Sequence, residues 1–181
     1  MPRYIAFLRA INVGGRNVPM RVLAREFERL GFDDVETFIA SGNVIFTTAS
    51  RSAAALERRI ERALASSLGY EVTTFVRTDD EVAAVAGYRP FAEPDLRRAV
   101  ALNVGLVAAP LPAAARKAVE ALTSDIDTFH VHGREVYWMC QKKQSDSKFS
   151  NAVLERALKM RSTFRGLNTI RRLAEKLGGR G

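Results

Sequence analysis

The chain has 181 residues, of which 47% are hydrophobic and 27% are charged, a composition that excludes a largely disordered protein. Its one cysteine, Cys140, excludes an intramolecular disulfide, and the short N-terminal apolar run, interrupted by Arg9, excludes a signal peptide and a membrane span, so we expect a cytoplasmic protein. The net charge of +8 arises at the end of the chain, with 12 Lys plus Arg against 4 Asp plus Glu from Arg134 onward, which indicates an anionic partner.

The first half of the chain predicts the order strand, helix, strand, strand, helix, strand, which is the ferredoxin-like βαββαβ pattern. The expected strands cover residues 4–9, 35–40, 44–48 and 70–77, and the expected helices cover 19–30 and 53–68. Right-handed crossovers make the first two strands parallel. The loop that contains Gly14 and Gly15 should therefore lie at the same sheet edge as the hairpin turn at Ser41, Gly42 and Asn43.

The second half predicts a similar series of elements. A short helix opens at Thr78, and residues 88–94 break it. A strand at 98–107, a helix at 111–122, a hairpin of strands 129–132 and 135–140, a helix from Lys148 to about Met160 and a last helix at 167–177 follow. We therefore predict the α+β class with two similar subdomains: residues 1–78 are ferredoxin-like, and residues 79–181 form a ferredoxin-like variant with an extra C-terminal helix.

The helix expected at Lys148 carries a candidate site. Lys148, Asn151 and Glu155 stand at i, i+3 and i+7, so they share one helix face. Ser145 or Ser147 can cap this helix, and a capped N-terminus beside a lysine is suited to phosphate. The same spacing is also typical of an ordinary capped surface helix.

Other motifs point less clearly to chemistry. The Gly14-Gly15 loop has no phosphate-loop consensus, although Arg9, Asn12, Arg16 and Asn17 surround it. Phe7 and Phe46 lie where RNA-binding modules carry stacking aromatics, but the module's consensus is absent, so we expect both in the core. His130 and His132 share a strand face without further ligands at metal-site spacing. We expect no metal and no cofactor, and we find no catalytic triad.

Four motifs together resemble a known family. They are Arg9 to Asn17, Ser41 to Phe46, Ser147 to Glu155, and Thr163 to Ile170. In this order they resemble the bacterial family catalogued as domain of unknown function 1697, over nearly the whole chain. The resemblance implies an α+β protein of two similar subdomains and implies no activity.

The chain departs from the family pattern at three positions. Ala10 replaces a usual glycine, and Gly166 and Leu167 replace a usual asparagine and tryptophan. If that tryptophan stacks on a ligand base, this chain lacks the stack.

The first functional hypothesis is a protein that binds a phosphate-bearing ligand, a nucleic acid or a nucleotide, in a cleft between the subdomains. The candidate ligand-binding residues come from the four motifs: Arg9, Asn12, Gly14, Gly15, Asn17, Ser41, Gly42, Asn43, Lys148, Asn151, Arg165, Asn168 and Thr169. An alternative is an enzyme for a small phosphorylated substrate, with Glu155 as general base and Lys148 and Arg165 neutralising charge. A third is an adaptor whose basic end docks an acidic protein.

Overall fold

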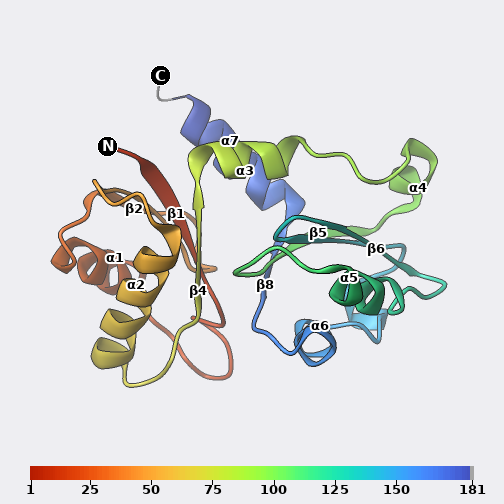
Figure 1. Cartoon of the computed structure of the whole chain (residues 1–181), viewed down its shortest axis with the longest axis horizontal. Coiled ribbons are helices and arrows are strands. Elements are labelled where there is room, and N and C mark those ends of the chain that lie inside the picture. The colour runs from red at the N-terminus through yellow and green to blue at the C-terminus, as the bar shows by residue number, and fades with distance from the viewer. Residues whose placement is uncertain (180–181) are drawn as a thin grey trace. The chain divides into compact units, whose positions relative to one another are not determined.

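The computed structural model describes residues 1–179, and its internal contacts divide the chain into two units, Met1–Val82 and Ala83–Gly181. Each unit is built on one four-stranded antiparallel sheet with helices beside it (Figure 1). The predicted α+β class with two similar subdomains is therefore confirmed. None of the described helices has the length and apolar character needed to cross a membrane.

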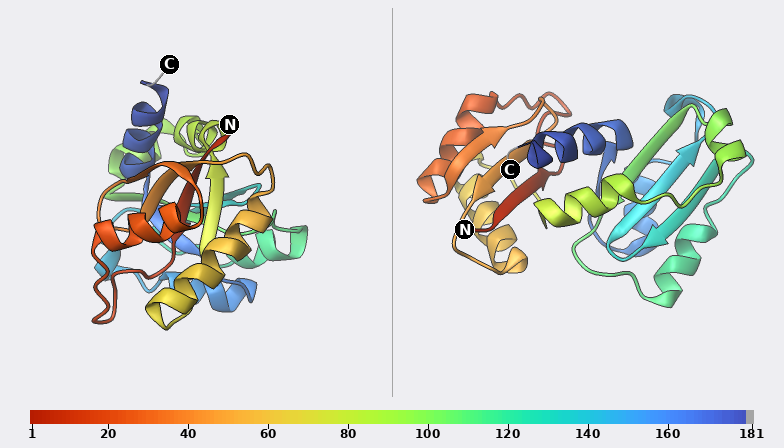
Figure 2. Two further views of the ribbon diagram at one scale, coloured as in Figure 1. Left: turned by 90° about the vertical axis from the view of Figure 1, so that its left-hand side faces the viewer. Right: turned by 90° about the horizontal axis from the view of Figure 1, so that it is seen from above.

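The first unit has the strand order β2-β3-β1-β4. Its elements are β1 (Arg3–Leu8), α1 (Met20–Arg29), β2 (Asp33–Thr37), β3 (Asn43–Thr47), α2 (Ala53–Leu68), β4 (Thr74–Thr78) and the start of α3 (Asp79–Gly87). Helices α1 and α2 lie beside each other on one face of this sheet (Figure 2). The predicted element order is confirmed.

The apolar stripes of the two helices build the core of this unit. Leu23 and Phe27 of α1 and Ile60 of α2 pack with Phe46 in one buried cluster. The Phe46 ring stacks on that of Phe32, with 4.5 Å between centroids, a geometry that adds to the burial energy of the pair. Phe46 is fully buried. Phe7, on the other face of the sheet, is buried as well, so both phenylalanines are core residues as predicted.

The second unit repeats this topology with the order β6-β7-β5-β8. After α4 (Glu93–Arg98) come β5 (Ala101–Leu106), α5 (Ala113–Glu120), β6 (Asp127–His132), β7 (Glu135–Cys140), a 3₁₀ turn η1 (Gln144–Asp146), α6 (Asn151–Leu158), β8 (Thr163–Gly166) and α7 (Leu167–Gly178). The unit is thus a complete βαββαβ fold followed by one extra helix. The extra C-terminal helix was predicted, whereas the strand β8 was not.

Three predicted elements of the second unit were wrong in detail. The strand expected from Arg98 begins only at Ala101, because residues 93–98 form α4, with Pro94 in its first turn. No strand was predicted between the helix ending near Met160 and the last helix, yet residues Thr163–Gly166 form the edge strand β8. Its short alternation contains the buried Arg165, and a charged residue in so short a segment hides the strand pattern.

The helix expected from Lys148 begins instead at Asn151. The N-cap is Ser150, whose Oγ accepts a hydrogen bond from the Val153 N–H at 3.3 Å. Phe149 is buried in the core against Trp138, and this contact fixes the chain in an extended conformation before the helix. Lys148 therefore does not share a helix face with Asn151 and Glu155.

Strand β4 lies at the edge of the sheet and pairs with one strand, β1. Along its other side, backbone N–H groups of β4 donate hydrogen bonds to glutamate carboxylates. The N–H groups of Thr74, Val76 and Thr78 donate to Glu61, Glu57 and Glu81 at 2.9, 3.0 and 2.8 Å. Glu57 and Glu61 stand one turn apart on α2, so their carboxylates match the two-residue spacing along the strand. These side chains occupy donors that would otherwise pair with another strand.

We expect the double variant Glu57→Ala/Glu61→Ala to expose this edge and to self-associate. The measurement is light scattering or sedimentation at increasing protein concentration. Arg58→Ala/Arg62→Ala alters the same helix at positions that do not bond to β4, so it serves as the matched control and should behave as the wild type. A double glutamate variant no more associated than this control would contradict the prediction.

Candidate functional site

The two predicted loops of the first unit meet at one sheet edge. The Leu8 N–H donates to the Gly42 carbonyl at 2.8 Å. Asn12 joins the loops: its Nδ2 donates to the Ala40 carbonyl at 2.9 Å, and its Oδ1 accepts from the Val18 N–H at 2.8 Å. The prediction that these loops are neighbours is confirmed. Because both ends of the Asn12 amide hold the backbone, its role in the structure is to join the two loops.

The hairpin residues are also engaged inside the fold. Asn43 is fully buried, and its Nδ2 donates to the Phe38 carbonyl and to Ser41 Oγ, both at 2.9 Å. Gly42 has a positive φ of 83°, and a Cβ built on it would lie 2.6 Å from Ile11 Cγ2. This part of the motif shapes the connection between strands.

The exposed part of the first loop is the turn at Gly14 and Gly15. Both glycines have positive φ, and nothing lies within 4 Å of where a Cβ would be. Next to them, Arg16 lies over the Tyr70 ring, 4.0 Å from its centroid, in a cation–π contact. Asn17 is exposed and Arg9 is half-buried. The turn leaves backbone open to solvent beside one positioned guanidinium, and ligand binding by these residues stays a prediction.

Ala10, in the same loop, has a positive φ of 54°. The usual glycine of the family adopts this conformation freely, whereas an L side chain there costs about 1–2 kcal/mol. The replacement at this position is therefore a strained one.

In the second unit, Asn151 and Glu155 hold the turn between α6 and β8. Asn151 Nδ2 donates to the Ser162 carbonyl at 2.8 Å and to Glu155 Oε1 at 3.2 Å. Glu155 Oε1 also accepts from the Ser162 N–H at 3.1 Å, and its Oε2 forms an ion pair with Arg161 at 3.4 Å. The Ser162 hydroxyl donates to Asn151 Oδ1. A carboxylate with this many donors is suited to fixing a turn and poorly suited to accepting a substrate proton.

Lys148 lines a cavity of about 370 Å³ in the second unit. Three carboxylates line it as well, those of Asp125, Asp127 and Asp146. Three negative charges around one ammonium repel a further anion. The surroundings of Lys148 therefore disfavour phosphate.

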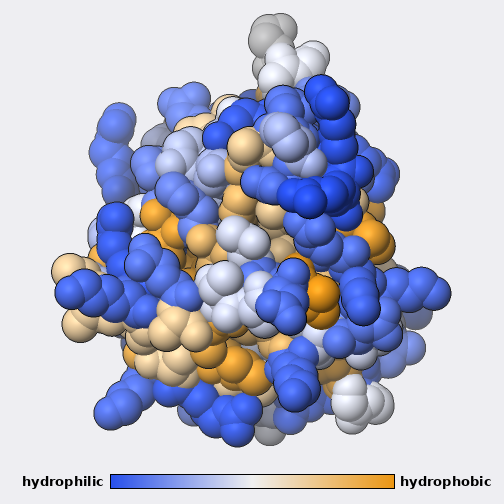
Figure 3. All heavy atoms as spheres, turned by 90° about the vertical axis from the view of Figure 1, so that its right-hand side faces the viewer, coloured by the Kyte–Doolittle hydropathy of each residue, from blue (hydrophilic) through white to orange (hydrophobic). Residues whose placement is uncertain are grey.

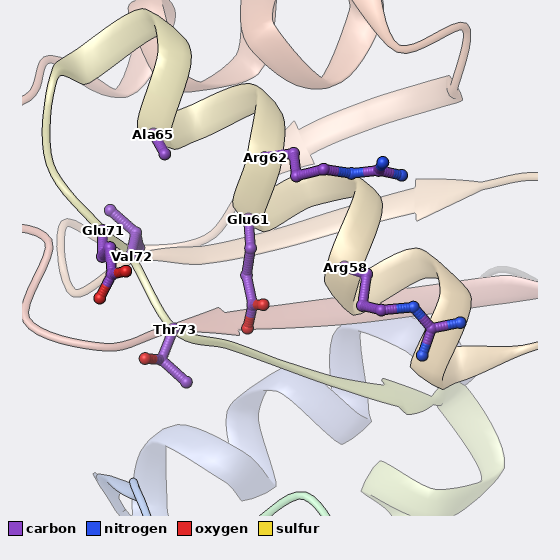
Figure 4. A pocket seen from close by; sticks show the side chains of 7 residues that line it. All are labelled: Arg58, Glu61, Arg62, Ala65, Glu71, Val72 and Thr73. Atoms are coloured by element: carbon purple, nitrogen blue, oxygen red, sulfur yellow. The ribbon is translucent and has the colours of Figure 1, made fainter.

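Another cavity, about 480 Å³, lies along α2 in the first unit. Figure 4 shows Glu61 reaching from α2 toward Thr73, whereas Arg58 and Arg62 extend away from Glu71. Glu61 is already bonded to the β4 backbone. The residues that line this cavity include two arginines and two glutamates, so their charges cancel. None of the predicted site residues lines the cavity.

Arg165 is 7% exposed and donates to Thr163 Oγ1 at 2.8 Å and to the Phe164 carbonyl at 2.9 Å. Desolvation by burial lowers the pKa of Arg165 to about 10. Leu167, where the resemblance implies a tryptophan, is 2% exposed and lines a small cavity of the unit. A side chain at this position packs inside the protein, so the lack of a tryptophan here removes no exposed stacking surface.

The start of α7 combines an uncapped helix end with an unpartnered amide. Its N-cap is Gly166, so no side chain caps the helix. Asn103 lies opposite Gly166 in the β5–β8 register, and its Oδ1 is 3.9 Å from where a Gly166 Cβ would be. Asn103 is 7% exposed, and its Nδ2 is buried without a hydrogen-bond partner. Asn168, in the first turn of α7, is exposed, and Thr169 is half-buried.

This end of α7 can hold an anion. Free N–H groups and the positive end of the helix dipole attract negative charge. A rotation of the Asn103 amide exchanges its oxygen and nitrogen, so it can present a donor toward Gly166. Sequence reasoning singled out Asn168 and Thr169 but missed Asn103, whose only signal was a polar residue within an apolar strand.

The two histidines share one face of β6, as predicted, and pack against Tyr88. The Tyr88 hydroxyl and His130 Nε2 are 2.8 Å apart, and the rings of Tyr88 and His132 stack with 4.1 Å between centroids. Burial, with smaller contributions from His132 and Arg116, lowers the pKa of His130. Among the residues that the structure describes, no three potential metal ligands gather in one place.

One face of the molecule, shown in Figure 3, is covered mostly by hydrophilic side chains with small scattered apolar areas. Large exposed apolar side chains in the described part of the chain are few: Met1, Val13, Ile39 and Val100. Of these, Val13 and Ile39 belong to the two loops that the Asn12–Ala40 hydrogen bond joins.

Comparison with known proteins supports the fold assignment. A solved structure of a conserved bacterial protein from Streptococcus pneumoniae is similar to this chain, with 26% sequence identity and a TM-score of 0.77. The similarity covers 98% of this chain and 99% of that one. No curated protein matches.

A family model described as "Protein of unknown function (DUF1697)" matches residues 1–137. The matched residues contain the whole first unit and continue into β7 of the second. The family resemblance is thereby confirmed, with the first two of the four sequence motifs inside the match, and the chain belongs to the DUF1697 family of proteins of unknown function.

Proposed function

We propose that this protein binds a phosphate-bearing ligand, a nucleic acid or a nucleotide, at the N-terminal end of α7. The observation that carries the proposal is the uncapped start of α7 beside Asn103, whose Nδ2 is buried without a hydrogen-bond partner. A buried amide nitrogen without a partner is uncommon in folded proteins, and once rotated toward Gly166 it would donate to a bound phosphate oxygen. Backbone N–H groups at the helix start would supply further donors.

The distribution of charge supports an anionic ligand on this unit. Residues 83–181 contain 17 Lys plus Arg against 9 Asp plus Glu, whereas residues 1–82 contain 11 of each. Helix α7 itself carries Arg171, Arg172 and Lys176 against Glu175. A basic surface of this kind raises the local concentration of phosphate groups and speeds their association.

The test uses labelled single-stranded RNA and DNA 12-mers and a labelled nucleotide, with binding followed by fluorescence anisotropy at 50 and 200 mM salt. We expect affinity to fall with salt, with a slope of about 0.7 per phosphate contacted. Asn168→Asp places a negative charge beside the phosphate but favours the helix dipole. It should therefore weaken binding about tenfold while the protein stays folded.

Ser66→Asp is the matched control, because it makes the same charge change at an exposed position of α2 in the first unit. It should bind as the wild type does. Saturable binding by none of the probes, or equal affinity of Asn168→Asp and the control, would refute the proposal.

The enzyme alternative receives no support from the geometry. Its proposed base, Glu155, is bonded to the turn before β8. We therefore propose binding and no reaction.

A further inference from the structure

Two arginines without an acidic partner line one small cavity of the second unit. Arg89 follows α3, and Arg171 lies on the second turn of α7. The cavity between them has room for about 10 Å³, enough for one water-sized group. Tyr88, Phe91, Tyr137 and Leu167 form much of its apolar wall.

Arg171 has no hydrogen bond or ion pair among the described residues, and its Nε is buried. Burial and the neighbouring positive charge of Arg89 both lower the pKa of Arg171. The Arg171 side chain is only half-buried, but a guanidinium without an acidic partner beside a like charge is unfavourable. This cost falls when an anion lies between the two groups.

Arg89 is held in place by carbonyl groups. Its Nη1 donates to the Ala86 carbonyl at 2.9 Å and to the Tyr88 carbonyl at 3.4 Å. Carbonyls orient a guanidinium but leave its full positive charge unbalanced. Its remaining N–H groups are available to a ligand.

We propose that Arg89 and Arg171 together bind a terminal phosphate, the phosphomonoester end of the ligand, at the solvent-accessible opening of this cavity, because its interior has room only for a water-sized group. A phosphomonoester carries nearly two negative charges at neutral pH and so balances both guanidiniums, whereas a phosphodiester carries one. The planar fork of arginine matches phosphate oxygens in pairs.

This proposal rests on the proposed function and makes it more specific. Asn168 and Arg171 are three residues apart on α7, so they are neighbours on one side of the helix. The terminal phosphate lies at Arg171, and the next part of the ligand lies toward the start of α7. The preferred ligand is therefore a nucleotide or a nucleic acid with a free 5′ or 3′ phosphate.

The test compares one DNA 12-mer in three forms, with a 5′ phosphate, with a 3′ phosphate and with hydroxyl groups at both ends, in the anisotropy assay. A nucleoside monophosphate is compared with its nucleoside in the same way. The wild type should bind at least one phosphorylated form about tenfold more tightly than its unphosphorylated counterpart. Arg171→Gln and Arg89→Gln should remove this preference. Arg97→Gln, an exposed arginine of α4 in the same unit, makes the same charge change and should keep it.

The outcomes separate this inference from the proposed function. Equal affinity for phosphorylated and unphosphorylated forms, with binding still weakened by Asn168→Asp, would overturn the inference and leave the proposed function standing. A phosphate preference that survives in Arg171→Gln would also overturn it. Absence of binding to every probe would overturn both.

Thermal unfolding of the same variants shows whether Arg171 serves the fold instead. Since Arg171 has no partner, Arg171→Gln should unfold at or above the wild-type temperature, and the phosphorylated probe should stabilise the wild type only. If Arg171→Gln unfolds at a lower temperature, Arg171→Lys replaces it in the assay. This variant keeps the charge without the fork, and it should lose most of the phosphate preference.

Discussion

Asp127→Ala is expected to destabilise the second unit by about 3–5 kcal/mol. Asp127 is 3% exposed and accepts three hydrogen bonds: from Trp138 Nε1 at 2.8 Å, from Ser147 Oγ at 2.5 Å and from Ser124 Oγ at 3.3 Å. Alanine leaves the indole N–H and the Ser147 hydroxyl without an acceptor. Each buried donor left unpaired costs about 1–3 kcal/mol.

Trp138 reports this effect directly, because it is the one tryptophan of the chain and a partner of Asp127. Urea unfolding followed by its fluorescence measures the stability of the second unit. Asp125→Ala is the matched control, since Asp125 is exposed and close in sequence, and it should change stability by less than about 0.5 kcal/mol. If Asp127→Ala unfolded at the same urea concentration as this control, the hydrogen-bond network would not stabilise the unit.

Gly42→Ala is expected to cost the first unit about 3 kcal/mol. Two effects add: a side chain at a φ of 83° is strained by about 1 kcal/mol, and the new Cβ would lie 2.6 Å from Ile11 Cγ2 and 3.2 Å from Leu8 Cβ. Both neighbours are buried, so they can move little. Overpacking of this kind costs about 1–3 kcal/mol.

Gly15→Ala separates the two effects. Gly15 has nearly the same φ, 82°, but nothing lies within 4 Å of its Cβ position. It should therefore show the conformational cost alone, about 1 kcal/mol. Urea unfolding followed by far-ultraviolet circular dichroism measures both variants. Equal losses in the two would show that the contact with Ile11 contributes nothing.

The elements with strong local patterns could be predicted from the sequence. Helix α2 was predicted with its observed bounds, because Leu56, Ile60 and Leu64 recur at helical spacing between the cap at Ser52 and Gly69. Helix α6 could not be placed, because Ser145, Ser147 and Ser150 are all suitable caps. Only the burial of Phe149 selects the last of them.

The candidate site was less predictable, because its partners come from distant elements. Asn12, Asn43, Asn151 and Glu155 belong to motifs that can be recognised in the sequence, yet their side chains bond to the protein itself. No local pattern reveals that Asn103 lies opposite Gly166, or that Arg171 lies beside Arg89. The predicted cleft between the subdomains stays a prediction.

The shared strand order has a consequence for biosynthesis. In each half the first strand made is a central one: β1 pairs with β4, and β5 pairs with β8. Each central strand therefore leaves the ribosome long before its last neighbour, and such distant pairings form slowly. The sheet of the first half can be completed while the second half is still being translated. The sheet of the second half is completed only after residues 163–166 leave the ribosome. A nascent chain halted before them therefore keeps one apolar edge of β5 unpaired, and we expect chaperones to shield that edge.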